Sequence, residues 1–66
     1  MEWNDIEQQW DRMKVHARVR WDKLTDKDVS QVAGNRGLLI AKIRERYALS
    51  AHDAEKEVQA FKDLFL

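Results

Sequence analysis

The chain has 66 residues, with twelve basic and twelve acidic side chains, no cysteine, no proline and two glycines. This length allows one domain, spanning residues 1–66, which buries only about 60% of the surface that its unfolded form exposes. The lack of cysteine excludes disulfides and thiolate metal sites, and the charge balance argues against a strongly basic nucleic-acid-binding domain.

The same composition predicts a cytoplasmic, all-α protein. The N-terminal residues lack the basic and apolar regions of a signal peptide. No apolar run approaches the roughly 20 residues that are needed to span a bilayer, so we expect no membrane association. Many strong helix formers, together with the lack of proline, favour helices throughout.

The first predicted helix begins at Asn4, which can act as the N-cap with Glu7 three residues later. Apolar side chains then recur at steps of three or four residues, which is the period of one face of an α-helix. We therefore predict one continuous helix that ends near residue 21. Its buried stripe consists of Ile6, Trp10, Met13, Ala17 and Trp21.

Three shorter helices follow, each with its own capping residue. Thr25 caps the second helix with Asp28 at its third position, and Gly34 suits a left-handed C-terminal cap. Asn35 caps the third helix and Ser50 caps the fourth. The apolar side chains that we expect these helices to bury are Val29, Val32, Leu39, Ile40, Ile43, Tyr47, Ala54, Val58, Phe61 and Phe65.

The basic residues of the third helix are expected on its surface. Lys42, Arg44 and Arg46 lie near its C-terminal end, where positive charge is favourable for the helix dipole. Because each of the four helices has one narrow apolar stripe, they can share a core only by packing together. Short helices of unequal length favour two helical hairpins packed crosswise over a long parallel bundle.

A characteristic set of residues extends in constant register over nearly the whole chain. It consists of Trp3, Ile6, Trp10, Lys14, Trp21, Lys23, Leu24, Thr25, Asp26, Asp28, Gly34, Arg36, Leu39, Lys42, Ile43, Glu45, Arg46, Tyr47, Ala54, Glu55, Lys56 and Val58. This combination of spacings resembles the CsbD-like family of small bacterial general stress-response proteins. The resemblance implies a small cytoplasmic protein that accumulates under stress, with short helices arranged like a sterile alpha motif. It implies no catalytic residue and no cofactor.

The chain departs from that family pattern at several positions where family members often have glycine. This chain instead has Gln8, Val15, Asp22, Ala41 and Ala48. A better helix former in place of a helix-interior glycine stabilises by up to about 1 kcal/mol. Ala48 differs from the other four: if the backbone at position 48 is left-handed, alanine destabilises the fold there relative to glycine.

The sequence contains no recognisable catalytic or metal-binding constellation. His16 and His52 are the only histidines, and neither has neighbours at metal-ligand spacing. Thr25 and Ser50 are explained as caps. Acidic residues in the first turn of a helix have their charge stabilised, which opposes the raised pKa of a general acid. We therefore expect no enzyme activity, no cofactor, no metal and no small-molecule ligand.

Two surfaces remain as candidate functional sites. Val15 and Val19 lie roughly opposite the apolar stripe of the first helix, and Leu38 lies off the stripe of the third. These side chains are a candidate partner surface, either for another protein or for weak self-association. The alternative is a basic ridge on the first helix that contacts the phosphates of nucleic acid, formed by Arg12, His16, Arg20 and Lys23.

The first hypothesis is a non-enzymatic protein with the stress-response role that the resemblance implies. By elimination, its mode of action is to bind or protect other macromolecules. A small nucleic-acid-associated module that uses the basic side of the first helix is the second, although a zero net charge gives little long-range attraction. The third is a marginally folded, solvating protein that acts by its abundance.

Overall fold

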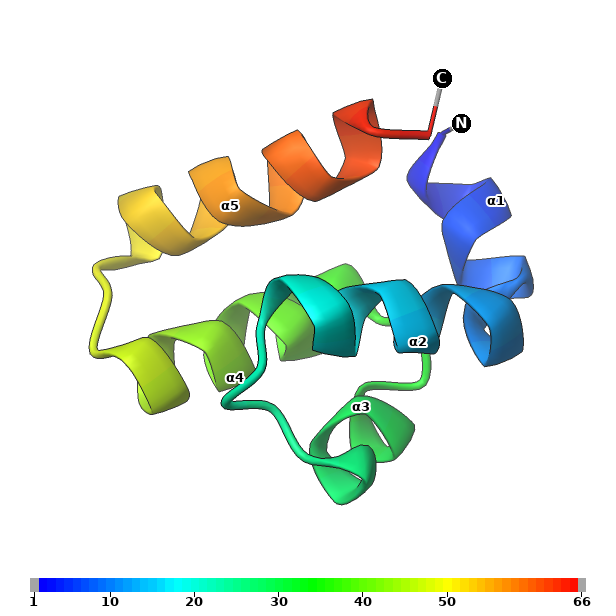
Figure 1. The fold of residues 1–66 in the computed structure, drawn as a ribbon. Coiled ribbons are helices and arrows are strands. Elements are labelled where there is room, and N and C mark those ends of the chain that lie inside the picture. The colour runs from blue at the N-terminus through cyan, green and yellow to red at the C-terminus, as the bar shows by residue number, and fades with distance from the viewer. Residues whose placement is uncertain (1, 66) are drawn as a thin grey trace.

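The computed structural model describes residues 2–65, which form five α-helices and no strand. The helices are α1 (Trp3–Gln8), α2 (Trp10–Arg20), α3 (Asp26–Val32), α4 (Arg36–Tyr47) and α5 (Ala51–Asp63). Helices α4 and α5 run antiparallel as a hairpin, and α1 and the end of α5 bring the two chain ends together (Figure 1). The all-α prediction is confirmed, but the prediction of four helices is wrong. Within residues 2–65, no helix is long and apolar enough to cross a bilayer.

The extra helix arises because the first predicted helix is broken at Gln9. Its backbone angles, φ −107° and ψ 26°, are not helical, and the chain changes direction there. Helix α1 also begins earlier than predicted, with Glu2 as N-cap in place of Asn4. The backbone N–H of Glu2 donates to Oδ2 of Asp5 at 3.3 Å. The apolar step of four from Ile6 to Trp10 spans the break, so the periodicity did not indicate it.

The predicted apolar stripes form the core of the described chain. The buried apolar residues are Ile6, Trp10, Met13, Ala17, Trp21, Leu24, Val29, Val32, Leu39, Ile43, Ala54, Val58 and Phe61. Ile40, Tyr47 and Phe65 are partly buried and pack against this cluster, which confirms the stripes while placing these three residues at the edge of the core.

Each tryptophan side chain is fixed by a hydrogen bond from its indole N–H to a distant part of the chain. A buried indole N–H needs an acceptor, because an unpaired donor in an apolar environment is costly. Each of the three bonds connects segments that are far apart in the sequence. The donors and acceptors are Trp3 with the carbonyl oxygen of Gly34 (2.8 Å), Trp10 with that of Val29 (2.8 Å), and Trp21 with Oε1 of Glu57 (3.2 Å).

The predicted N-caps of the later helices are confirmed. The hydroxyl of Thr25 accepts the backbone N–H of Asp28 at 3.0 Å, and the Asp28 carboxylate accepts the N–H of Thr25 at 3.1 Å. This reciprocal pair is a capping box. The same type of cap bond joins Asn35 to the N–H of Leu38 (3.0 Å) and Ser50 to that of Asp53 (3.1 Å).

The turn between α3 and α4 differs from the prediction that Gly34 caps α3. The capping residue is Ala33, with φ 49°, and Gly34 follows with φ 82°. A Cβ atom on Gly34 would lie only 2.9 Å from Cα of Glu7 in α1. Glycine is therefore needed here both for the backbone angle and for close packing. Ala48 caps α4 with φ 53°, so it does occupy a left-handed position.

An ion pair between a buried carboxylate and an exposed arginine connects α3 to α4. Asp28 is 2% exposed, and its two carboxylate oxygens accept bonds from Nε and Nη2 of Arg46 at 3.0 Å each. The Nζ atom of Lys42 lies 3.6 Å from the same carboxylate. The bonds from Arg46 and from the backbone N–H of Thr25 hold the pKa of Asp28 well below its usual range. Arg46 is exposed, as predicted, but its pairing with Asp28 was not predicted.

Replacing Trp21 by alanine should unfold much of the population. The side chain is 2% exposed, and truncation of a buried aromatic residue costs about 3–5 kcal/mol, a large part of the stability of a small domain. Urea denaturation followed by circular dichroism measures the loss. Trp21→Phe, which keeps an aromatic ring but removes the bond to Glu57, should lose less. An unchanged melting temperature for Trp21→Ala would contradict this placement of the core.

The two glycines should respond oppositely to alanine. Gly34→Ala should destabilise, because of its positive φ and the contact with Glu7. Gly37→Ala should stabilise by up to about 1 kcal/mol, because Gly37 lies in α4 with space for a Cβ atom. Ala48→Gly should also stabilise, since it relieves a left-handed alanine. Thermal melts of the three variants provide the measurement, and equal effects of both glycine substitutions would contradict the turn geometry.

The Asp28 ion pair should make stability depend on pH at the acid end. The pKa of Asp28 is lower in the folded chain than its unfolded value of about 3.9. Its contribution is therefore complete above that unfolded value and is lost as the pH falls below about 4. In Asp28→Asn, urea midpoints should be lower at neutral pH and fall less on acidification. Asp53→Asn, at the third position of α5, is the control, because Asp53 is exposed and forms no ion pair in the described chain. An equal pH profile for both variants would refute the assignment.

Candidate functional site

The outer face of α2 exposes two neighbouring valines. Trp10, Met13 and Ala17 point into the core, and the 100° turn per residue places Val15 and Val19 on the opposite side. Val15 is 60% exposed and Val19 is 79% exposed. We call these two residues the valine patch. The exposure expected from the helical angle is confirmed, whereas a role in binding remains a prediction.

Leu38, the third residue of the predicted partner surface, is 50% exposed. It belongs to the first turns of α4, not to α2. Val15 and Val19 are four residues apart on α2, so their side chains are neighbours on one face of that helix. Leu38 shares their exposure, but it is on a separate element and is a separate candidate.

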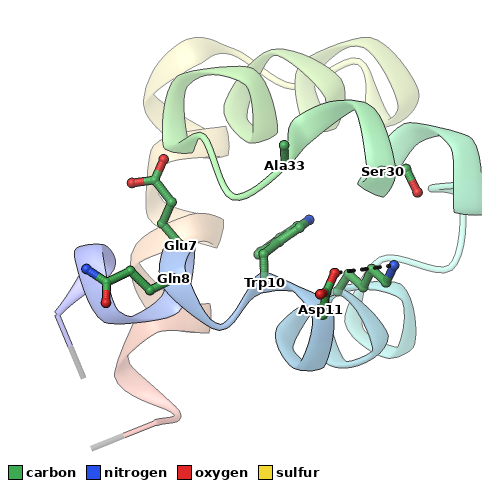
Figure 2. Close-up of a pocket in the computed structure, with 7 residues that line it drawn as sticks. Glu7, Gln8, Trp10, Asp11, Ser30 and Ala33 are labelled. Atoms are coloured by element: carbon green, nitrogen blue, oxygen red, sulfur yellow. Dashed lines mark ion pairs between the residues drawn. The ribbon is translucent and has the colours of Figure 1, made fainter.

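A groove between α2 and α3 borders the valine patch. One hollow of about 320 Å³ is lined at the α1 end by Glu7, Trp10 and Asp11 (Figure 2). A second hollow of about 180 Å³ includes Val15 in its lining. Lys14 and Ser30 line both, so the two hollows are adjacent, and we call the pair the α2–α3 groove. Sequence reasoning missed this groove, because its walls depend on how two separate helices pack.

Part of the predicted basic ridge is already engaged by other helices. Nη2 of Arg20 lies 3.9 Å from Oε2 of Glu57 in α5, and its guanidinium carbon is 5.6 Å from the Trp21 ring centroid. The Nζ atom of Lys23 lies 5.1 Å from the ring centroid of Tyr47 in α4. The Arg20–Glu57 pair is too long for a hydrogen bond and screens that cation only weakly, whereas the Tyr47 ring covers part of the Lys23 cation.

The remaining ridge residues are Arg12 and His16, which are both exposed. The His16 ring lies 5.3 Å from the ring of Phe65, centroid to centroid. The ridge therefore is not a uniform row of free cations, since three of its four members contact side chains from other parts of the fold. This arrangement weakens the case for phosphate binding along α2.

A third hollow, of about 450 Å³, lies where the ends of α2 and α4 meet α5. Trp21, Tyr47 and Leu49 form its apolar side. Its charged lining is balanced, with two basic and two acidic residues: Arg20, Lys56, Asp53 and Glu57. This balance gives the hollow no preference for a charged partner, in contrast to the α1 end of the α2–α3 groove.

The chain matches bacterial proteins over most of its length. It is 34% identical over 61 residues to a UPF0337 protein of Nitrosomonas europaea, covering 92% of this chain and 65% of that relative. It therefore spans about two thirds of that protein. It is 41% identical over 54 residues to a UPF0337 protein of Pectobacterium atrosepticum, covering 82% and 78% of the two chains.

A UPF0337 protein of Protochlamydia amoebophila is 35% identical over 60 residues, covering 91% of each chain. No family model matches the chain, and no solved structure matches it. The predicted likeness to a sterile alpha motif therefore stays a prediction. Identity above 30% over most of the relatives' length shows that the chain belongs to the UPF0337 family, the CsbD-like family that its sequence resembles.

Proposed function

We propose that this protein is a non-enzymatic stress-response protein that acts by binding another macromolecule, with the valine patch as the contact surface. The observation that carries the proposal is the exposure of Val15 and Val19, at 60% and 79%, on a helix whose other large apolar residues are buried. Clustered exposed apolar side chains are typical of interaction sites. The stress-response role follows from the family resemblance, as does a cytoplasmic location.

The hydroxyl and carboxylate groups that could act in catalysis have structural contacts instead, which supports a role without catalysis. The hydroxyls of Thr25 and Ser50 accept cap hydrogen bonds from the backbone. Asp28 has a lowered pKa because of its bonds with Arg46, whereas a general acid at neutral pH needs a raised one. These groups therefore have structural roles in the described chain.

A protein partner, or weak self-association, accounts for the surface better than nucleic acid does. Arg20 and Lys23 contact Glu57 and Tyr47, and the chain has no net charge to attract a polyanion. The nucleic-acid-associated role remains the second candidate, with the exposed Arg12 as its principal support. For the architecture, we propose that the helices form crossed hairpins similar to a sterile alpha motif.

Changing Val15 and Val19 together to glutamate should abolish partner binding without unfolding the chain, because both side chains are exposed. Tagged full-length protein is used to capture partners from stressed bacterial cells, with quantitative mass spectrometry as readout. Leu64→Glu is the matched control, since Leu64 is also an exposed apolar residue, at 65%. Partners retained by the wild type and by Leu64→Glu should be lost from the double variant.

Equal capture by the double variant would contradict the proposal, provided that its thermal melt matches that of the wild type. Sedimentation of the wild type at millimolar concentration tests self-association, and a purely monomeric protein would leave only the protein-partner form. If duplex DNA produced salt-sensitive NMR shifts centred on Arg12 and Arg20, the nucleic-acid alternative would replace the proposal.

A further inference from the structure

We propose that the α2–α3 groove and the valine patch together bind an extended peptide segment of a partner protein. This segment has a cationic residue followed by apolar residues at alternate positions. The inference rests on the proposed function and names the chemistry of its partner. Three observations support it: the adjacency of the two hollows, the charge at the α1 end of the groove and the spacing of residues along α2.

The groove and the valine patch form one elongated surface. Lys14 and Ser30 line both hollows, so the two hollows lie next to each other along α2 and α3. Val15 lines the second hollow and is 60% exposed, and Val19 is one turn further along α2. A partner that occupies the groove therefore continues directly onto exposed apolar side chains, which it can remove from water.

The α1 end of the groove favours a cation. Among residues 2–65, Glu7 has no ion-pair partner within 4 Å. The Asp11 carboxylate is fully exposed and lies 3.9 Å from Nζ of Lys14, too far for a hydrogen bond. Figure 2 shows Trp10 between these two carboxylates, but its side chain is 6% exposed, so the two carboxylates determine the charge of this end. Two weakly engaged carboxylates against one lysine leave this end acidic.

The opposite end of the groove has no comparable charge preference. Nη1 of Arg18 forms a 2.6 Å ion pair with Oδ1 of Asp26, and its Nε donates to the carbonyl oxygen of Leu24 at 3.3 Å. The guanidinium is therefore occupied. Between this pair and the acidic end, Val15 and Val29 provide the apolar lining. The charge pattern selects a cation at the α1 end and an apolar group beside Val15.

The spacing along α2 fits an extended peptide. Asp11, Val15 and Val19 follow each other at steps of four residues, or about 6 Å of helix rise per step. An extended chain advances about 6.6 Å over two residues, with alternate side chains on the same side. Each step of four residues also turns about 40° around the helix, so the peptide crosses α2 obliquely. On that path, a cationic residue opposite Asp11 places apolar residues at the second and fourth positions after it near the two valines.

The test uses NMR titration of isotopically labelled full-length protein with two blocked pentapeptides, Lys-Ala-Leu-Ala-Leu and Glu-Ala-Leu-Ala-Leu. The lysine peptide should bind roughly fivefold more tightly, as one partly exposed charge contact allows. Its shifts should centre on Glu7, Asp11, Val15 and Ser30. Combining Glu7→Gln with Asp11→Asn should bring the ratio of the two affinities close to one. Glu45→Gln with Glu55→Gln, which removes two exposed carboxylates from other helices, should keep it.

Equal binding of both peptides, no binding of either, shifts confined to other helices, or a preference unchanged by the Glu7 and Asp11 substitutions would each overturn the inference. Partner capture with the valine double variant separates this failure from that of the proposed function. If the double variant still loses its partners, the valine patch remains the contact surface and only the charge-selective groove is refuted. If capture is also unaffected, both proposals fail.

Discussion

The fold depends on how the chain buries tryptophan without leaving an indole N–H unpaired. Each of the three indoles donates to an acceptor at least 19 residues away, so burial of the ring and fixing of a distant element occur together. The bond from Trp10 to the carbonyl oxygen of Val29 is the most consequential. It holds α3 against α2 at the place where the α2–α3 groove forms. The core therefore determines the shape of the candidate site.

The sequence predicted local features well, and its failures concern backbone geometry and long-range pairing. Helical periodicity identified the core because 3.6 residues per turn fixes which side chains share a face. The break at Gln9 was hidden because the apolar step from Ile6 to Trp10 continues through it. The left-handed cap at Ala33 was also missed, because alanine is the best helix former and does not indicate a left-handed backbone. The pairing of Asp28 with Arg46 was missed because each residue already had a sufficient local explanation in its own helix.

For the candidate site too, the sequence predicted features of a single helix but not features that depend on several helices. Exposure of Val15 and Val19 follows from their angle on a single helix, so the sequence was enough to predict it. The α2–α3 groove has walls from two helices, and no spacing within either helix encodes the gap between them. The basic ridge stays a prediction, and the sequence did not indicate that Glu57 and Tyr47 from other helices lie beside Arg20 and Lys23.

The residues shared with the family and the residues proposed for binding are largely different sets. Trp10, Asp28 and Gly34 belong to the family pattern, and each has a structural role in a hydrogen bond, an ion pair or a close turn. Val15 stands instead at a position where family members often have glycine. A valine there adds exposed apolar surface beside the groove without disturbing the core, since the side chain points outward. The proposed contact surface therefore uses side chains on the outer face of α2 that the core does not need.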